Sequence, residues 1–343
     1  MAGVWHAAGQ VWPAFVLVGG LLLVGVVAEA DGLFEAAGAA LARAPGGTRT
    51  AFLLALTLVV GVTAVLNLDT SVFFLTPVLL HLARARGVDE APFLYGSVFM
   101  SNAASLFLPG SNLTNLIALH GEHVSGATFL SRMLGAAIAA VVTTTLVLLV
   151  LFRRELHSAP EESSERAPAR AGIGLVAIAA ATVAVLVLAA PALPVLGIGV
   201  AACLLRRVRR ERVAAVLDLR VLVGLFVVAV LLGAVGRWWT GPAELLDHLG
   251  RVGTAVAGAV AAIAVNNLPA SVLLTPHPPE HARALLLGLN LGPNLAVTGS
   301  LSAFLWFRVA RALDARPSVR TYSQIGIVLV PISLAAALAA SYV

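Results

Sequence analysis

The sequence predicts an all-α polytopic membrane protein that is built from two inverted repeats. Of its 343 residues, 59% are hydrophobic and only 11% are charged, whereas soluble domains carry about 25% charged residues. The second observation is a polar interruption that occurs twice inside apolar sequence. Residues 66–77 read LNLDTSVFFLTP, and residues 266–276 read NNLPASVLLTP. We therefore expect about eight spans and two re-entrant helical hairpins, since a span needs roughly 20 apolar residues.

The expected spans follow from the apolar runs. They lie at about 13–30, 91–120, 127–152, 171–190, 191–205, 221–236, 283–308 and 324–342. Two further pairs of runs, 50–66 with 71–83 and 251–265 with 271–282, are each too short to cross alone and meet at the polar interruptions. Backbone that leaves the helix at membrane depth is tolerated only where protein or a water-filled cavity covers it. We interpret the pairs as re-entrant hairpins with tips near 67–71 and 266–271.

The arginines predict the orientation of the chain. All 22 basic residues are arginines, and 18 of them fall in loops that share one side if residue 1 is external. These loops are 31–49, 81–90, 153–170, 206–220 and 308–320. Cytoplasmic loops carry an excess of positive charge, so we expect a multi-pass protein of the cytoplasmic (inner) membrane with both termini external. We favour an ordinary loop over an amphipathic surface helix for 206–220.

The same distribution excludes other classes of partner and chemistry. The basic residues are spread over short loops between spans and form no single basic face, so nucleic acid is not an expected partner. Cys203 is the only cysteine, which excludes a disulfide or a three-thiolate site within one chain. We interpret it as a small apolar packing residue.

Each hairpin is followed by a second polar interruption. Residues 101–119 read SNAASLFLPGSNLTNLIAL, and residues 287–306 read LGLNLGPNLAVTGSLSAFLW. Glycine, a turn residue and Asn-Leu interrupt both, so we expect broken helices near 109–115 and 290–298. The chain then divides into a first repeat at 1–152, a cytoplasmic linker at 153–170 and a second, inverted repeat at 171–343.

This order of elements predicts a transport site. A broken helix exposes backbone N–H and C=O groups near the midplane, with partial positive charge at the N-terminus of a half-helix. Two tips and two breaks that converge would form one polar site with alternating access. A single mid-span Asn or Pro is more often interhelical glue or a kink. Four interruptions in matched order favour the transport site.

In these motifs the sequence resembles the bacterial arsenite efflux permeases of the ion transporter superfamily. The likeness rests on AEADGLFE at 28–35 and on the four stretches quoted above, in the same order along the chain. It implies an inner-membrane carrier that exports arsenite or antimonite, and it leaves open a soluble ATPase partner and a homodimer. The superfamily also contains dicarboxylate carriers, silicon exporters and sodium/proton antiporters, the last being the main alternative. Members usually have about two more spans before the first hairpin, where this chain has only 13–30.

The family pattern, carried over residue by residue, implicates polar side chains at both tips and both breaks. In the first repeat these are Asn67, Asp69, Thr70, Ser111, Asn112, Thr114 and Asn115, and in the second Asn266, Asn267, Asn290, Asn294 and Thr298. Trivalent arsenic in neutral water is chiefly the uncharged trihydroxide. Amides and hydroxyls can bind this solute through hydrogen bonds and release it easily, because no As–S bond forms.

Asp69 is the only acidic residue that we place deep in the membrane. Ionisable groups there are costly and functional by default, so we interpret Asp69 as the carrier of a coupling proton. The alternative is a helix cap that stabilises the second arm of the hairpin. Pro269 stands at the matching place of the second tip, so we expect one coupling proton and not two.

No signature of an enzyme occurs in the sequence. H-E-x-x-H, paired intramembrane aspartates and a P-loop are absent, so we expect neither catalysis nor ATP hydrolysis by this chain, and no cofactor. The loop histidines are typical of solvated residues, and we expect no metal site. A passive channel is a third class, over which the inverted repeat favours a carrier.

Overall fold

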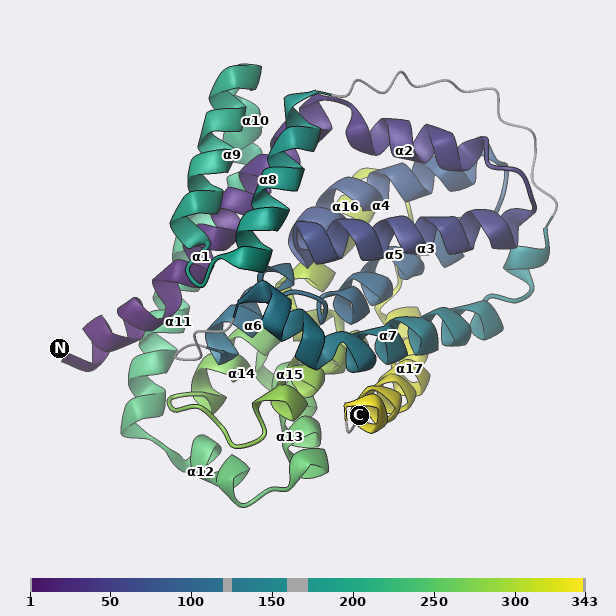
Figure 1. The fold of residues 1–343 in the computed structure, drawn as a ribbon. Helices are drawn as coiled ribbons and strands as arrows, with labels where there is room; N and C mark the ends of the chain where they lie inside the picture. The colour runs from purple at the N-terminus through teal and green to yellow at the C-terminus, as the bar shows by residue number, and fades with distance from the viewer. Residues whose placement is uncertain (1, 120–124, 159–171, 342–343) are drawn as a thin grey trace.

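The all-helical, multi-span fold that the sequence predicts is confirmed. The computed structural model describes residues 2–119, 125–158 and 172–341, and every regular element within those ranges is a helix (Figure 1). Six helices are long and apolar enough to cross a membrane. They are Val4–Ala30, Thr48–Val65, Leu68–Ala85, Gly126–Leu151, Arg210–Trp238 and Val319–Ala340. Ile173–Val187 and Ala192–Arg206, which the sequence predicts as spans, are shorter apolar helices, and so is Arg251–Val265, an expected hairpin arm.

The first half of the chain contains seven α-helices in the described residues. They are α1 (Ala2–Ala30), α2 (Leu33–Ala42), α3 (Thr48–Val65), α4 (Leu68–Ala85), α5 (Ala91–Ala104), α6 (Leu113–Ala118) and α7 (Gly126–Leu151). Helix α1 begins earlier than the expected 13–30 and contains Pro13. The expected loop at 31–49 is wrong in part, because it contains α2. That segment is rich in Ala and Leu, which are strong helix formers, and it follows the left-handed Gly32.

The second half contains α8 (Ile173–Val187), α9 (Ala192–Arg206), α10 (Arg210–Leu217), α11 (Leu219–Trp238), α12 (Gly241–Asp247), α13 (Arg251–Val265), α14 (Asn267–Leu274), α15 (Ala282–Leu291), α16 (Leu301–Ala312) and α17 (Val319–Ala340). Short 3-10 turns lie at Pro109–Ser111 (η1), Glu155–His157 (η2), Gly292–Leu295 (η3) and Val297–Gly299 (η4). The predicted linker at 153–170 falls mostly outside the described residues.

Three boundaries differ from the sequence prediction. The segment 206–220 is not simply a loop, since it contains α10, none of whose residues is buried. The second arm of the second hairpin ends at Leu274 and not near 282, because three prolines within 276–279 cannot continue a helix. The arms α3 and α4 have 18 residues each, so both are longer than predicted and reach the length of a span.

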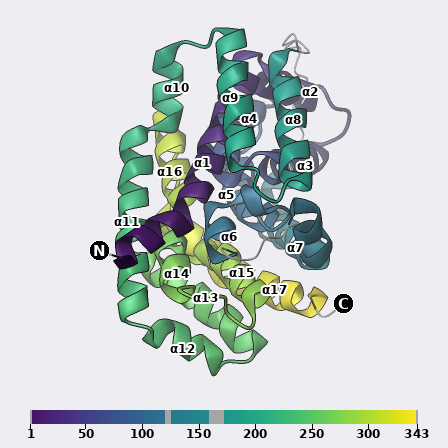
Figure 2. The same cartoon turned by 60° about the vertical axis from the view of Figure 1, so that its left-hand side comes forward.

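Hydrogen bonds gather the arginine-rich loops at one end of the molecule. Arg206 Nε donates to Asp31 Oδ1 at 2.5 Å, which joins the end of α9 to the segment after α1. At the other end, Arg237 Nη2 donates to Gln10 Oε1 at 2.8 Å. Helices α10 and α12 lie at opposite ends in both views (Figure 2). The arrangement fits the arginine rule, and the assignment of the arginine-rich end to the cytoplasm stays a prediction.

Small residues allow the closest helix contacts, as is common between membrane helices. Helix α1 packs against α9 through Gly20 and Gly199; a Cβ on Gly20 would lie 2.7 Å from Leu196 N. Helix α13 packs against α15 in the same way, and a Cβ on Gly288 would lie 2.0 Å from Ala255 O. The second contact brings α15, and with it the second break, against the first arm of the second hairpin.

Candidate functional site

A small cavity lies where four helices begin. Its volume is about 30 Å³, close to one water molecule's share of the liquid (~30 Å³). The lining residues are Leu68 and Asp69 of α4, Asn112, Leu113 and Thr114 at the start of α6, Asn267 and Leu268 of α14, and Ser300, Leu301 and Ser302 at the start of α16. Both tips and both breaks therefore contribute residues to one small cavity, which a solute would have to enlarge.

A polar side chain caps each of these four helices. Oδ1 of Asn67 accepts from Thr70 N at 2.7 Å, Oδ1 of Asn112 from Thr114 N at 3.0 Å, Oδ1 of Asn266 from Leu268 N at 3.3 Å, and Oγ of Ser300 from Ala303 N at 3.1 Å. Asn and Ser are preferred at this position because their side chains satisfy N–H groups that the helix leaves unpaired. Much of the polarity of the tips and breaks is therefore capping chemistry that starts a helix inside the bundle.

The caps change two details of the sequence interpretation. Helix α14 is capped by Asn266, so the structural counterpart of Asn67 is Asn266, one position before the identical Asn267. The cap on α4 is Asn67 and not Asp69, which is the second residue of the helix. The interpretation of Asp69 as the cap of α4 is therefore wrong.

Asp69 is a half-buried carboxylate on the cavity wall. Within the described residues its side chain has no hydrogen bond and no ion pair. It lies in the first turn of α4, where the positive end of the helix favours a negative charge. A carboxylate without a protein partner at such a place is available to a proton or to a bound solute.

A buried amide network joins the two breaks, with Asn290 at its centre. Asn290 Oδ1 accepts from Asn112 Nδ2 at 2.7 Å and from Ser105 Oγ at 2.6 Å. Asn290 Nδ2 donates to Asn115 Oδ1 at 2.7 Å. A parallel bond runs from Asn102 Nδ2 to Asn294 Oδ1 at 2.8 Å. These side chains are at most 3% exposed, and buried hydrogen bonds such as those around Asn290 rigidify the segments that they connect.

Four buried polar atoms near the site have no hydrogen-bond partner among the described residues. They are Asn67 Nδ2 and Thr70 Oγ1 at the first tip, and Asn102 Oδ1 and Asn294 Nδ2 between the breaks. Leaving such a group unpaired costs about 1–3 kcal/mol. Water or a polar solute that reached these atoms would recover that energy.

Helix α17 positions the second break. Tyr322 Oη donates to Pro293 O at 3.1 Å. The glycine at 326 permits a close approach, because a Cβ there would lie 2.1 Å from Asn294 O. The first break is held separately by Ser111, whose Oγ donates to Ala64 O near the end of α3 at 3.0 Å.

The predicted site residues divide into three groups. Asp69, Asn112, Thr114 and Asn267 line the cavity. Asn67, Thr70, Asn115, Asn290 and Asn294 are buried beside it as caps, unpaired groups or members of the network. Ser111, Asn266 and Thr298 do not line the cavity: Asn266 Nδ2 donates to Thr298 O at 3.0 Å, and the Thr298 side chain is exposed.

Sequence reasoning missed four residues. Asn102 and Ser105 belong to the network, and Ser300 and Ser302 line the cavity. All four stand within the motifs quoted for the breaks, so motif membership was a usable signal. The second break is also longer than expected, because α16 begins only at Leu301. By capping, the counterpart of Asn112 is therefore Ser300 and not Asn294.

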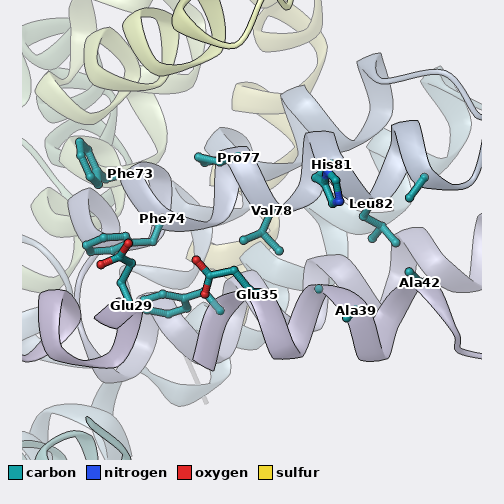
Figure 3. Close-up of a pocket in the computed structure, with 13 residues that line it drawn as sticks. Glu29, Glu35, Ala39, Ala42, Phe73, Phe74, Pro77, Val78, His81 and Leu82 are labelled. Atoms are coloured by element: carbon teal, nitrogen blue, oxygen red, sulfur yellow. The ribbon is translucent and has the colours of Figure 1, made fainter. Parts of the chain in front are cut away.

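A larger cavity of about 560 Å³ lies away from the breaks, between α2 and α4 (Figure 3). In Figure 3 Glu35 lies on α2, and the α4 side chains Val78 and His81 lie on the neighbouring helix. Glu29, the other carboxylate in the lining of this cavity, forms an ion pair with Arg212 at 3.2 Å. No residue of the tips or breaks lines this cavity, so we do not place the solute there despite its size.

Comparison with known proteins identifies the family. Residues 4–305 match the model of a family that is described as citrate transporter. The chain belongs to the citrate transporter family. Within this family setting, it is 25% identical to the arsenical pump membrane protein of Escherichia coli (strain K12), over 95% of this chain and 84% of that protein. The predicted resemblance to arsenite efflux permeases is confirmed.

Two other similar proteins have different descriptions. The 46 kDa membrane protein of Mycobacterium leprae is 25% identical over 97% of this chain and 86% of its own length. The silicon efflux transporter LSI3 of Oryza sativa subsp. japonica is 28% identical over 42% of this chain and 30% of its own length. Together with the family match, they support a multi-pass membrane transporter.

A solved structure shares the fold. The crystal structure of the YdaH transporter of Alcanivorax borkumensis, described as having an unusual topology, superposes with a TM-score of 0.60. The match covers 98% of this chain and 86% of that one at 15% identity. This likeness concerns the fold alone. This member of the citrate transporter family thus has the architecture of a transporter.

Proposed function

We propose that this protein is a secondary active transporter that exports arsenite or antimonite across the cytoplasmic membrane in exchange for protons. The observation that carries the proposal is the cavity beside Asp69 at which α4, α6, α14 and α16 begin. The likeness to arsenical pump membrane proteins supports the choice of solute. The small volume of the cavity favours a small solute.

The electrostatics of the cavity favour a solute rich in oxygen over a cation. Helices α4, α14 and α16 have 18, 8 and 12 residues and direct their positive ends towards it. Each N-terminus stabilises a negative group by about 0.3–1 kcal/mol, or about 1–3 kcal/mol for three. The same field opposes a sodium ion, for which Asp69 would be the only carboxylate in the cavity lining. The sodium/proton alternative is therefore less well supported.

Exchange with protons follows from competition for one carboxylate. The uncharged trihydroxide donates a stronger, charge-assisted hydrogen bond to Asp69 while the carboxylate has no proton. Its oxygens can accept from the helix N-termini and from the hydroxyls of Thr114 and Ser302 on the cavity wall. Protonation of Asp69 therefore weakens solute binding, and solute binding opposes protonation. We propose that each outward movement of solute is followed by a return with Asp69 protonated.

The arrangement of caps supports the repeat organisation that we propose. The second arm of each hairpin and the second part of each broken helix begin at a capped N-terminus beside the cavity. This correspondence supports inverted repeats at 1–152 and 171–343 with the linker between them. Each repeat would then supply one tip and one break to the same solute.

A carboxylate carrier is the second candidate, because the family is described as citrate transporter and helix N-termini attract anions. The two candidates differ in the sign of proton coupling. An anion binds better when Asp69 is protonated, so it would move with a proton and not against one. Its size would also require a larger expansion of the cavity.

Everted vesicles with a lumenal pH dye test the proposal. After acidification of the lumen, arsenite should make it more alkaline if exchange occurs. Citrate should make the lumen more acidic if an anion moves together with a proton, and sodium should make it more alkaline if the sodium alternative holds. A response to citrate or sodium without a response to arsenite would reject arsenite export. Vesicles without the protein provide the baseline.

A further inference from the structure

A second polar cavity lies outside the proposed transport site, at the end of the molecule where α13 and α15 begin. Its volume is about 200 Å³. Three arginines from three helices line it: Arg132 of α7, Arg251 of α13 and Arg283 of α15. They are three of the four arginines that lie outside the arginine-rich loops. Nothing in the proposed function uses this concentration of positive charge.

Two of the three guanidinium groups are available to a ligand. Arg132 and Arg283 are exposed, and neither has a hydrogen bond or an ion pair within the described residues. Arg251 Nη2 donates to the carbonyl oxygen and to Oγ of Ser341, each at 3.0 Å, so that α13 is fixed to the end of α17. Glu280 is the only carboxylate in the lining and forms no ion pair in the described residues. Among the described lining residues, three arginines therefore accompany one carboxylate.

The backbone adds to this positive potential. Helix α13 follows Gly250 and α15 follows His281, and neither residue caps its helix with a side chain. The helices have 15 and 10 residues. Their first N–H groups have no intrahelical partner and, with the helix dipole, favour an anion beside Arg251 and Arg283.

We propose that this cavity binds the phosphate group of an anionic ligand. The planar guanidinium fork matches phosphate oxygens in geometry and charge. Arg132 and Arg283 would contact the phosphate from two different helices, α7 and α15. The apolar lining residues Leu119, Phe129 and Met133 would pack against any hydrocarbon attached to it. The phosphate can belong to an anionic phospholipid headgroup or be free inorganic phosphate, and the chemistry at the arginines is the same.

The experiment uses the full-length protein in a maltoside detergent, which contains no phosphate. The thermal unfolding midpoint is followed by tryptophan fluorescence while inorganic phosphate is titrated in one arm and short-chain phosphatidylglycerol in the other. Ligand that binds only the folded state raises the midpoint by an amount that grows with the logarithm of its concentration above the dissociation constant. Arg132→Gln and Arg283→Gln should each weaken binding by roughly tenfold, as expected for loss of a charge-assisted hydrogen bond.

Two matched variants separate binding from general damage. Glu280→Gln removes the one negative charge of the lining and should strengthen binding severalfold, which mere disruption of structure would not do. Arg237→Gln removes an arginine from the same end of the molecule that does not line the cavity, and should leave affinity unchanged.

The two arms distinguish the source of the phosphate. Stabilisation by inorganic phosphate that the arginine variants lose identifies a free-anion site, and stabilisation by phosphatidylglycerol alone identifies a lipid headgroup site. Absence of stabilisation in both arms would overturn the proposal. Equal stabilisation of wild type, Arg283→Gln and Glu280→Gln would overturn it as well, because binding would then take place elsewhere. If an arginine variant fails to fold, the Glu280→Gln comparison decides alone.

Discussion

Replacement of Asp69 by Asn is the most direct test of the proposed proton coupling. The substitution removes the only carboxylate of the cavity lining and keeps nearly the same shape. Helix α4 should begin unchanged, because Asn67 and not Asp69 caps it. Loss of a negative charge from the first turn of a helix costs about 0.3–1 kcal/mol, so the variant should fold.

The expected loss of solute affinity is small, whereas the loss of coupling is complete. A hydrogen bond to a charged group contributes about 1.5–3 kcal/mol, and one between neutral groups about 0.5–1.5 kcal/mol. The difference of about 1–1.5 kcal/mol weakens solute binding roughly five- to tenfold. No other acidic residue lines the cavity, so no group remains to exchange a proton for the solute. Asp69→Asn should therefore exchange arsenite without accumulating it.

The assay compares two modes of transport in the same everted vesicles. Proton-driven uptake of arsenite should fall to the level of empty vesicles, while exchange of labelled for unlabelled arsenite at equilibrium should continue. Glu35→Gln is the matched control, because Glu35 lines the other cavity and should pump normally. Normal accumulation by Asp69→Asn would refute proton coupling through this residue. Loss of both modes at normal protein level would make Asp69 a binding residue without a coupling role.

Three further predictions test the site, its packing and the topology. Asn290→Ala should lower stability by roughly 3 kcal/mol or more, because it leaves several buried polar groups unpaired; thermal unfolding measures this, and an unchanged midpoint would contradict the network. Gly25→Ala should destabilise the fold by about 1–3 kcal/mol through overpacking, since its Cβ would lie 2.7 Å from Thr70 Cγ2. Adding Thr70→Ser removes that methyl group and should restore most of the lost stability. Additive losses in the double variant would show that this contact does not cause the destabilisation. The Cys203→Ser variant should export arsenite nearly as well as wild type. In that background, Ala85→Cys should react with an impermeant maleimide only after the cells are permeabilised. Labelling in intact cells would show that the predicted topology is reversed.

The sequence allowed prediction of the places where helices stop and start, because capping is local chemistry. Asn67 and Asn112 were singled out as polar residues inside apolar runs, and both begin a helix at the cavity. The same reasoning failed at the second break. Its two 3-10 turns delay α16 to Leu301, and the number of residues between two helices is not fixed by residue type alone.

Partners across the bundle could not be predicted. Asn102 and Ser105 precede the first break on α5 and its end, so in sequence they look like ordinary polar residues on a helix. Their importance comes from Asn294 and Asn290, which lie 192 and 185 positions away and meet them only in three dimensions. The exposure of the Thr298 side chain could not be predicted for the same reason, because it depends on which side of the second break faces the bundle.

The hydrogen bonds also indicate which parts of the bundle move during transport. Four bonds join the second break to the first break and to the end of α5: Asn102 with Asn294, and Asn290 with Ser105, Asn112 and Asn115. At about 0.5–1.5 kcal/mol each, separating the breaks would cost about 2–6 kcal/mol.

The first hairpin is held more weakly against its neighbour α5. Between the described residues of α4 and α5, the side-chain hydrogen bonds are Ser71 with Ser101 and Thr76 with Ser97, and both are long, at 3.3 Å. Buried atoms of the tip at Asn67 are unpaired. Rocking of one whole repeat against the other would break the stronger set of bonds, whereas movement of the hairpin would break the weaker one. We therefore expect the cavity to open by displacement of hairpin tips over a pair of breaks that stay together.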